Sequence, residues 1–210
     1  MKKITFLICG MLLGLAIPQT ASAQVQKGTV LIDAYYGFPN LYSAVFRAAY
    51  DGSDYQDYKV RGSGPFGIRG EYLLADKFGI GLDIGYNATK ITFTDTYNDT
   101  YDPNTGQYTQ TTYHYKYSTS KLGVMATFNF HFVETEHIDF YAVVGAGYGN
   151  RTFTFTSDDP TDNTSATSLI PVAFKTGVGL RYFFTENIGA NVAVQVGQGG
   201  IINGGISFKF

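Results

Sequence analysis

Ionisable side chains recur at alternate positions within segments that are otherwise apolar. Arg69 and Glu71 lie two residues apart, and Asp83 occupies the same kind of position in the next segment. Residues two apart in a strand share a face, so these charges would lie opposite the apolar side chains. Charges on an enclosed face are tolerated only when they are paired and hydrogen-bonded. We therefore predict a paired charge network made of Asp33, Arg69, Glu71, Asp83, Lys121, Lys175 and Arg181, with Arg151 and Lys209 facing the same way.

The three histidines, His114, His131 and His137, are the other side chains that could do chemistry. No serine and carboxylate stand at an obvious triad spacing beside any of them, although a triad is recognised by geometry. They fall at different heights of their segments, which suits a metal site poorly. The acidic stretches 99–104 and 158–163 lack the full calcium-loop spacing with its terminal Glu. We predict no catalytic residue, no cofactor and no metal.

Eight segments with two-residue alternation would position the charges. They cover residues 30–36, 66–74, 78–86, 122–132, 140–148, 172–184, 188–196 and 202–210. One face of each is apolar or aromatic, and the other carries mainly Gly, Ser, Thr and Asn. Each apolar band is about ten residues long, the length that a tilted strand needs to cross a bilayer. A soluble eight-stranded barrel would instead show a charged outer face.

The connections between these segments alternate in length. Residues 75–77, 133–137 and 185–187 are short, whereas 38–65, 95–112 and 157–167 are long and polar or Tyr-rich, with a final short connection near 198–200. Aromatic residues fall at both ends of the segments, as at the two membrane interfaces of a barrel. The short-turn end has Phe78, Phe132, Phe140, Phe184 and Phe210, and the long-loop end has Tyr36, Tyr86 and Tyr148. The pattern predicts an all-β fold, an eight-stranded antiparallel transmembrane β-barrel with short periplasmic turns and long extracellular loops.

Composition supports this fold class. Charged residues make up 15% of the chain, against about 25% in globular proteins. The net charge of −2 gives no electrostatic argument for binding nucleic acid. Beyond residue 23 no long unbroken apolar run exists, which argues against membrane-spanning helices. A barrel remains compatible because its alternation averages the hydropathy.

The first 23 residues have the features of a secretory signal peptide. Lys2 and Lys3 precede an apolar run from residue 4 to 17, and Ala21-Ser22-Ala23 forms a cleavage site. We predict a cleaved signal over 1–23 and a single barrel domain over 24–210. The only cysteine, Cys9, would leave with the signal, so no disulfide is expected.

With these features the chain resembles small outer-membrane β-barrel proteins of the OmpA/OmpX/OmpW-like kind. The resemblance rests on the signal ending, the eight alternating segments and the terminal Gly205-Ile206-Ser207-Phe208-Lys209-Phe210. It implies a bacterial outer-membrane protein in contact with outer-membrane lipids. It also implies that Ile206, Phe208 and Phe210 form the signal read by the barrel-insertion machinery, with the last segment pairing with residues 30–36. Nothing follows Phe210, so the cell-wall-binding domain of OmpA itself is not expected.

Eight strands leave an interior that side chains can fill, so we expect a closed lumen. If Leu74 pairs with Phe78, Arg69 lies opposite Asp83 and Glu71 opposite Gly81, which predicts an Arg69–Asp83 contact. The inward glycines would leave room for water. Leu41, Ala44, Val45 and Ala48 predict a short helix over 40–49, either capping the barrel mouth or lying on the membrane.

The predicted role is structural or surface interaction by a monomer. Tyr residues between 97 and 117 suit an extracellular ligand-binding surface, or they extend a hairpin above the membrane. A small porin-like channel is the alternative function, and a lipid-modifying enzyme is the remote one.

Overall fold

The computed structural model describes residues 25–49, 56–159, 163–167, 170–197 and 200–210. The predicted signal peptide, residues 1–23, lies outside them. The elements are β1 (Val30–Phe38), α2 (Leu41–Ala49), β2 (Gln56–Ala75), β3 (Phe78–Asp102), β4 (Gln107–Glu134), β5 (Ile138–Ser157), β6 (Thr164–Thr167), β7 (Val172–Phe183), β8 (Ile188–Val196) and β9 (Ile202–Lys209).

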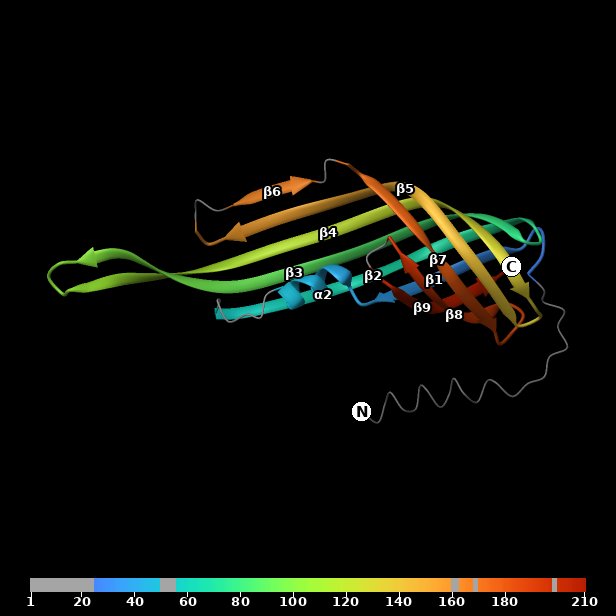
Figure 1. Cartoon of the computed structure of the whole chain (residues 1–210), viewed down its shortest axis with the longest axis horizontal. Coiled ribbons are helices and arrows are strands. Elements are labelled where there is room, and N and C mark those ends of the chain that lie inside the picture. Colours follow the sequence, from blue (N-terminus) through green and yellow to red (C-terminus); the bar gives the residue numbers. More distant parts are fainter. Residues whose placement is uncertain (1–24, 50–55, 160–162, 168–169, 198–199) are drawn as a thin grey trace, which may run out of the picture.

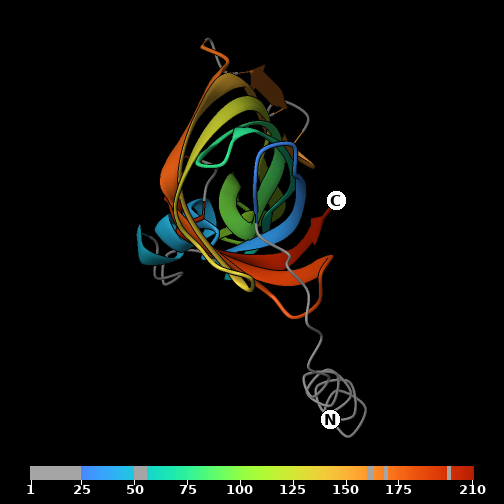
Figure 2. The same ribbon diagram turned by 90° about the vertical axis from the view of Figure 1, so that its right-hand side faces the viewer.

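Eight of these strands close into a ring (Figures 1 and 2). Their order is β4-β3-β2-β1-β9-β8-β7-β5, and a β4–β5 pairing closes the barrel. β6 adds to β5 outside the ring. The eight-stranded barrel is therefore confirmed, as is the predicted pairing of the last strand with the first, where Ala34 lies opposite Ile206. In the described part of the chain, no helix is long and apolar enough to span a membrane.

The barrel is apolar outside and polar inside. Ile68, Leu82 and Val194 are about half exposed on its outer surface, whereas Asp33, Asp83 and Arg181 are almost completely buried. At the short-turn end of the interior, Val25, Leu31, Leu73 and Phe183 form a small buried apolar cluster. The alternation thus serves a lipid-facing surface.

The four strands β2 to β5 continue far beyond the rest of the barrel (Figure 1). β3 has 25 residues and β4 has 28, whereas β8 has nine. Strand replaces loop in part of the two connections predicted over 38–65 and 95–112: residues 56–65 belong to β2, and 95–112 is strand apart from the turn at 103–106. The second case matches the alternative in which the Tyr-rich segment extends a hairpin above the membrane. Tyr and Thr favour extended backbone, and here they alternate, so the hairpin continues beyond the outward-facing apolar band of the membrane-crossing segments. We call the part of β2 to β5 beyond the other strands, together with β6, the extension.

The predicted helix in the first loop is confirmed as α2, which lies against the inner face of the barrel mouth. The Asn40 side chain accepts a hydrogen bond from the Ser43 N–H (3.1 Å) and donates to the Ala88 carbonyl (3.0 Å). It therefore caps the helix and ties it to β3 at once. The Arg151 guanidinium on β5 lies 3.7 Å from the centre of the Tyr42 ring. Of the two predicted positions, the structure shows the one at the mouth.

The predicted β2–β3 register is confirmed, since Arg69 lies opposite Asp83 and Glu71 opposite Gly81. The turn itself differs from the prediction. Ala75, not Leu74, pairs with Phe78, and a register shift between Leu73 and Ala75 absorbs the extra residue.

Candidate functional site

Asp33 is the centre of the charge network in the lumen. Its carboxylate accepts hydrogen bonds from Arg181 Nε (3.0 Å) and Nη2 (2.8 Å) and from Arg69 Nε (3.0 Å). The Ser207 hydroxyl donates a further bond of 2.6 Å. These residues come from β1, β7, β2 and β9, so the network joins opposite walls of the barrel. Two guanidiniums on one carboxylate offset the cost of burying it.

Arg181 extends the network to two more carboxylates. Its Nη2 donates to Glu71 (2.8 Å) and its Nη1 to Asp139 (2.6 Å). The ring of His131 joins the same two groups, with Nε2 at 2.8 Å from Glu71 and Nδ1 at 2.6 Å from Asp139. Ionised carboxylates only accept hydrogen bonds, so both ring nitrogens donate and the imidazole is cationic.

A second branch lies around Asp83, which forms an ion pair with Lys175. The Tyr35 hydroxyl donates to Asp83 (2.7 Å), and the Lys175 ammonium lies 5.1 Å from the Tyr35 ring centre. With His131 charged, four cationic groups balance the four carboxylates Asp33, Glu71, Asp83 and Asp139. All eight charged side chains are at most 4% exposed.

The Arg69–Asp83 contact predicted from the register is wrong. Asp33 is also directly opposite Arg69, on the neighbouring strand β1, and forms the ion pair with it. Asp83 is left to Lys175, which reaches it from β7 across the lumen. The strand register shows which residues lie opposite Arg69, but Asp33 and Asp83 both do so, and the register does not show which of the two pairs with it.

Six of the seven predicted network residues lie together in the lumen, and Lys121 does not. Its ammonium lies near the mouth, where it donates to the Gly197 carbonyl at 3.4 Å. Sequence reasoning did not assign His131 to the network, and it missed the membership of Asp139, Tyr35, Tyr141 and Ser207. The signal available in the sequence was the alternation itself, since the last four of these residues occupy odd-numbered positions of β1, β5 and β9, and the odd-numbered residues of those strands face the lumen. Asp139 was overlooked because it directly follows a turn.

Inward glycines hold space for network side chains. A Cβ at Gly79 would lie 2.1 Å from Glu71 Oε1, and one at Gly179 would lie 2.3 Å from the Tyr141 hydroxyl. Tyr141 in turn lies beneath two guanidiniums, with its ring centre 4.7 Å from Arg69 and 4.2 Å from Arg181. At these two positions the predicted room for water is therefore filled by side chains.

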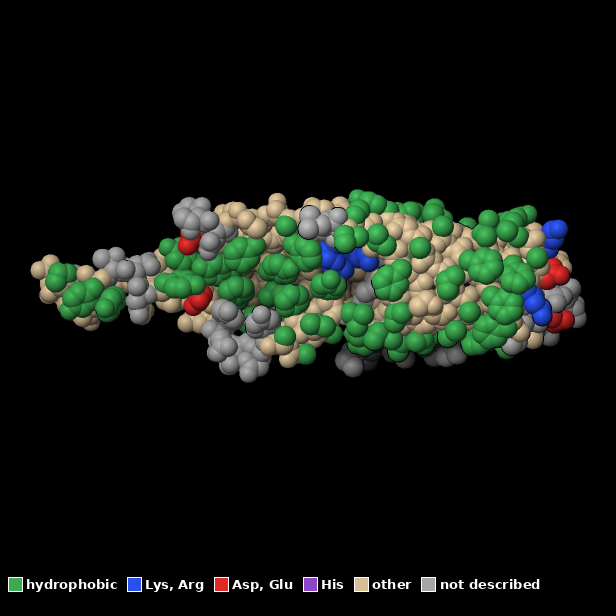
Figure 3. Space-filling model, turned by 45° about the horizontal axis from the view of Figure 1, so that its top comes forward, with side chains coloured by type: hydrophobic (Ala, Val, Ile, Leu, Met, Phe, Trp, Pro, Cys, Tyr) green, Lys and Arg blue, Asp and Glu red, His purple; other side chains and the backbone are tan. Residues whose placement is uncertain are grey.

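A second candidate surface lies above the mouth, on the inner face of the extension. Tyr115 stacks between Phe93 (5.0 Å between ring centres) and Phe155 (5.8 Å). Further along the same face, Tyr97 packs on Tyr113 at 6.1 Å. Figure 3 shows hydrophobic side chains gathered along the extension. We call this set, with Tyr117 and Phe153 at its base (6.3 Å), the aromatic face.

Residues 7–206 match the family described as "Outer membrane protein beta-barrel domain". The chain belongs to this family. Members are outer-membrane proteins, so the predicted localisation in the bacterial outer membrane holds, with the short turns periplasmic and the extension extracellular. No curated protein is detectably similar in sequence.

Three solved structures are similar in fold to this barrel. The N-terminal barrel domain of Pseudomonas aeruginosa OprF is 17% identical, with 88% of this chain and 99% of that chain covered and a TM-score of 0.47. Pseudomonas aeruginosa OprG is 14% identical, with 90% and 98% covered and a TM-score of 0.48. Yersinia pestis Ail, the attachment invasion locus protein, is 14% identical, with 88% and 99% covered and a TM-score of 0.39.

Among the described residues, no cluster of three or more His, Cys, Asp or Glu has an arrangement that could hold a metal ion. His114 and His137 lie apart from the lumen network. The His114 ring contacts Asp158, and the His137 ring contacts the Phe183 carbonyl. The charged groups in the lumen of this outer-membrane barrel protein are therefore engaged with one another, and the arrangement fills and cross-links the lumen.

Proposed function

We propose that this outer-membrane barrel is a non-enzymatic surface-interaction protein, in which the aromatic face of the extension binds an extracellular partner. The observation that carries the proposal is the set of rings that pack on one another along that face. Tyr97 is 45% exposed although it packs on Tyr113, so its ring is available to a partner while its position is already fixed by the neighbouring ring. Tyr gives large contact area at low entropic cost, as in antibody binding loops.

The partner would have apolar faces and little charge. Among the inward-facing residues of β3 from Ile91 to Tyr97 and of β4 from Thr111 to Tyr117, Asp95 is the one charged side chain. The opposing strands β7, β8 and β9 have 12, nine and eight residues, so they do not extend opposite the aromatic face. A sugar ring stacked on tyrosine, with hydroxyls bound by the phenols, fits such an open, nearly neutral surface.

Binding to an array of neutral glycans, with the protein in lipid nanodiscs, tests this proposal. Tyr97→Ala with Tyr113→Ala should reduce binding at least tenfold, because it removes the ring pair of the aromatic face that lies farthest from the barrel mouth. Thr96→Ala with Thr112→Ala is the matched control. This pair lies on the opposite face of the same strands, with its hydroxyls 3.0 Å apart, and should leave binding unchanged. Equal loss in both variants, or no glycan bound by the wild type, would contradict the proposal.

The porin-like alternative makes a different prediction. The ion-paired lumen supports a barrel that does not conduct, because the charged groups lie against one another and the short-turn end is plugged by Leu31, Leu73 and Phe183. Planar-bilayer recordings of the refolded protein should therefore show no sustained stepwise openings. Discrete, long-lived openings at moderate voltage would favour the channel.

A further inference from the structure

We infer that the outer surface of the barrel, at its extracellular rim, binds one phosphorylated lipid of the outer leaflet. The acyl chains would lie in an apolar groove across β9, β1, β2 and β3. The phosphate would lie on Arg61 and Lys90, just above the groove. This site faces the membrane, so it is separate from the aromatic face and does not depend on the function proposed for that face.

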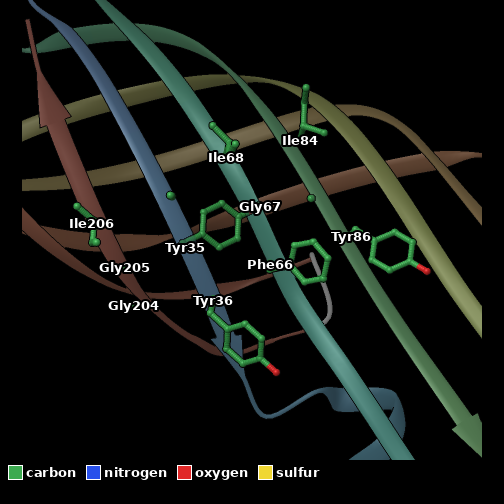
Figure 4. Close-up of a pocket in the computed structure, with 12 residues that line it drawn as sticks. Tyr35, Tyr36, Phe66, Gly67, Ile68, Ile84, Tyr86, Gly204, Gly205 and Ile206 are labelled. Atoms are coloured by element: carbon green, nitrogen blue, oxygen red, sulfur yellow. The ribbon is translucent and has the colours of Figure 1, made fainter. Parts of the chain in front are cut away.

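The apolar groove has a volume of about 670 Å³ (Figure 4). Small residues form its floor, chiefly Ala34, Gly204 and Gly205, and larger side chains form its walls. Ile68 on β2 and Ile206 on β9, the two strands that flank β1, are 58% and 43% exposed on the outer surface. In Figure 4 the rings of Tyr36, Phe66 and Tyr86 lie at one end of the groove. These rings belong to the extracellular aromatic girdle, so the groove begins at the interface and runs into the hydrocarbon region.

A polar hollow of about 340 Å³ adjoins the groove and shares Tyr86 with it. Arg61 and Lys90 line this hollow, together with Ser118, Ser120 and Thr154 from β4 and β5. The two spaces therefore form one continuous surface, apolar below Tyr86 and cationic above it. An amphipathic lipid has the same order of polarity from chain to head group.

The cations of the hollow lack the partners found in the lumen. Arg61 lies directly opposite Lys90 in the β2–β3 register, and like charges in such positions destabilise a sheet. Lys116 lies on the same face of β4, opposite Thr92. All three residues are exposed, and within the described residues none forms an ion pair. Lys59, on the same face of β2, is paired with Asp57 at 3.4 Å. A phosphate between Arg61 and Lys90 would convert their repulsion into two attractive contacts.

The height of the cations suits a head group. Lys90 lies four residues beyond Tyr86, which is about 13 Å along a strand and about 10 Å of height at the usual tilt. Lys and Arg side chains can extend back toward the interface while their apolar stems stay on the sheet. The hollow therefore falls in the layer that lipid phosphates occupy.

Native mass spectrometry of the whole protein, released from detergent micelles doped with lipid, tests the inference. The probes are bisphosphorylated lipid A and, as the zwitterionic comparison, phosphatidylcholine. The wild type should retain one lipid A and at least tenfold less phosphatidylcholine. Arg61→Gln with Lys90→Gln should lose at least tenfold of the retained lipid A. Lys27→Gln with Lys77→Gln, at the short-turn end, is the matched control and should retain the wild-type amount.

A second variant tests the groove independently of charge. Gly204→Leu fills it from the lipid side, where a Cβ meets only the Asn191 carbonyl at 3.7 Å. Gly70→Leu is its control, since a Cβ there meets nothing within 4 Å and the residue does not line the groove. Gly204→Leu should reduce lipid A retention severalfold and Gly70→Leu should not. Equal retention of both lipids, or wild-type retention by either the double Gln or the Gly204→Leu variant, would overturn the inference.

Discussion

Arg181 and Asp33 are 148 positions apart in the sequence, yet they meet in the lumen through an Nε–Oδ1 contact of 3.0 Å and an Nη2–Oδ2 contact of 2.8 Å. This pair connects β7 to β1 through the interior, while the backbone connects the same strands only around the ring, through β8 and β9. The lumen therefore contributes cross-links that the sheet cannot provide.

Arg181→Met should destabilise the folded barrel by about 3–5 kcal/mol, because it leaves several buried carboxylates without their cation. Urea unfolding of the protein in lipid vesicles would measure the change. Lys59→Met removes the exposed Lys59–Asp57 pair and should cost no more than about 1 kcal/mol. Adding Asp33→Asn to Arg181→Met should recover part of the loss. Strictly additive effects of these two changes would argue against their coupling.

Gly179→Val should destabilise the barrel by about 1–3 kcal/mol through overpacking. Its Cβ would lie 2.3 Å from the hydroxyl of Tyr141, whose ring packs against the guanidiniums of Arg69 and Arg181 and cannot easily move. Gly70→Val provides the comparison, since its Cβ points into open space. The same urea unfolding assay applies, and similar midpoints for the two variants would contradict the space-holding role of Gly179.

Deletion of Phe210 should reduce the amount of protein in the outer-membrane fraction severalfold. Phe210 exchanges two backbone hydrogen bonds of 2.9 Å with Val30 at the seam between the first and last strands. Its ring is 68% exposed at the periplasmic end, as expected for the proposed insertion signal with Ile206 and Phe208. Phe210→Tyr keeps an aromatic end and should insert normally. Wild-type yield after the deletion would refute the signal.

Asp158 should titrate below the ordinary carboxyl pKa of about 3.9. The His114 backbone N–H donates to it at 2.7 Å and the ring adds a 2.9 Å contact, and both lower the pKa of Asp158. A lowered folded pKa stabilises this contact above the unfolded pKa, and the stabilisation is lost as pH falls through the folded value. Carbon-13 NMR would follow the carboxyl. His114→Ala keeps the backbone donor, so the pKa should rise only part of the way. An ordinary pKa in the wild type would contradict the contact.

The sequence predicted the barrel well because alternation is a local property. Ile68 and Arg69 belong to opposite faces whatever the rest of the chain does, and eight such segments leave few alternatives to a closed ring. The extension was harder to predict, since Thr92, Tyr115 and Thr154 carry the strands onward without the outward-facing apolar band that marks the membrane-crossing segments. Six of the charged network members were predictable from the alternation, but their pairing was not. Which carboxylate Arg69 takes depends on the positions of Arg181 and Lys175 across the lumen, and no local pattern contains that information.

Because β4 runs unbroken from Gln107 to Glu134, the extracellular tip and the membrane-embedded wall share one backbone. A force applied to the tip along the strand axis would act in shear on the backbone hydrogen bonds that join β3 to β2 and β4 to β5. Many of these hydrogen bonds would resist the force at the same time. The protein would thus transmit mechanical force from a bound surface into the outer membrane without a hinge in between.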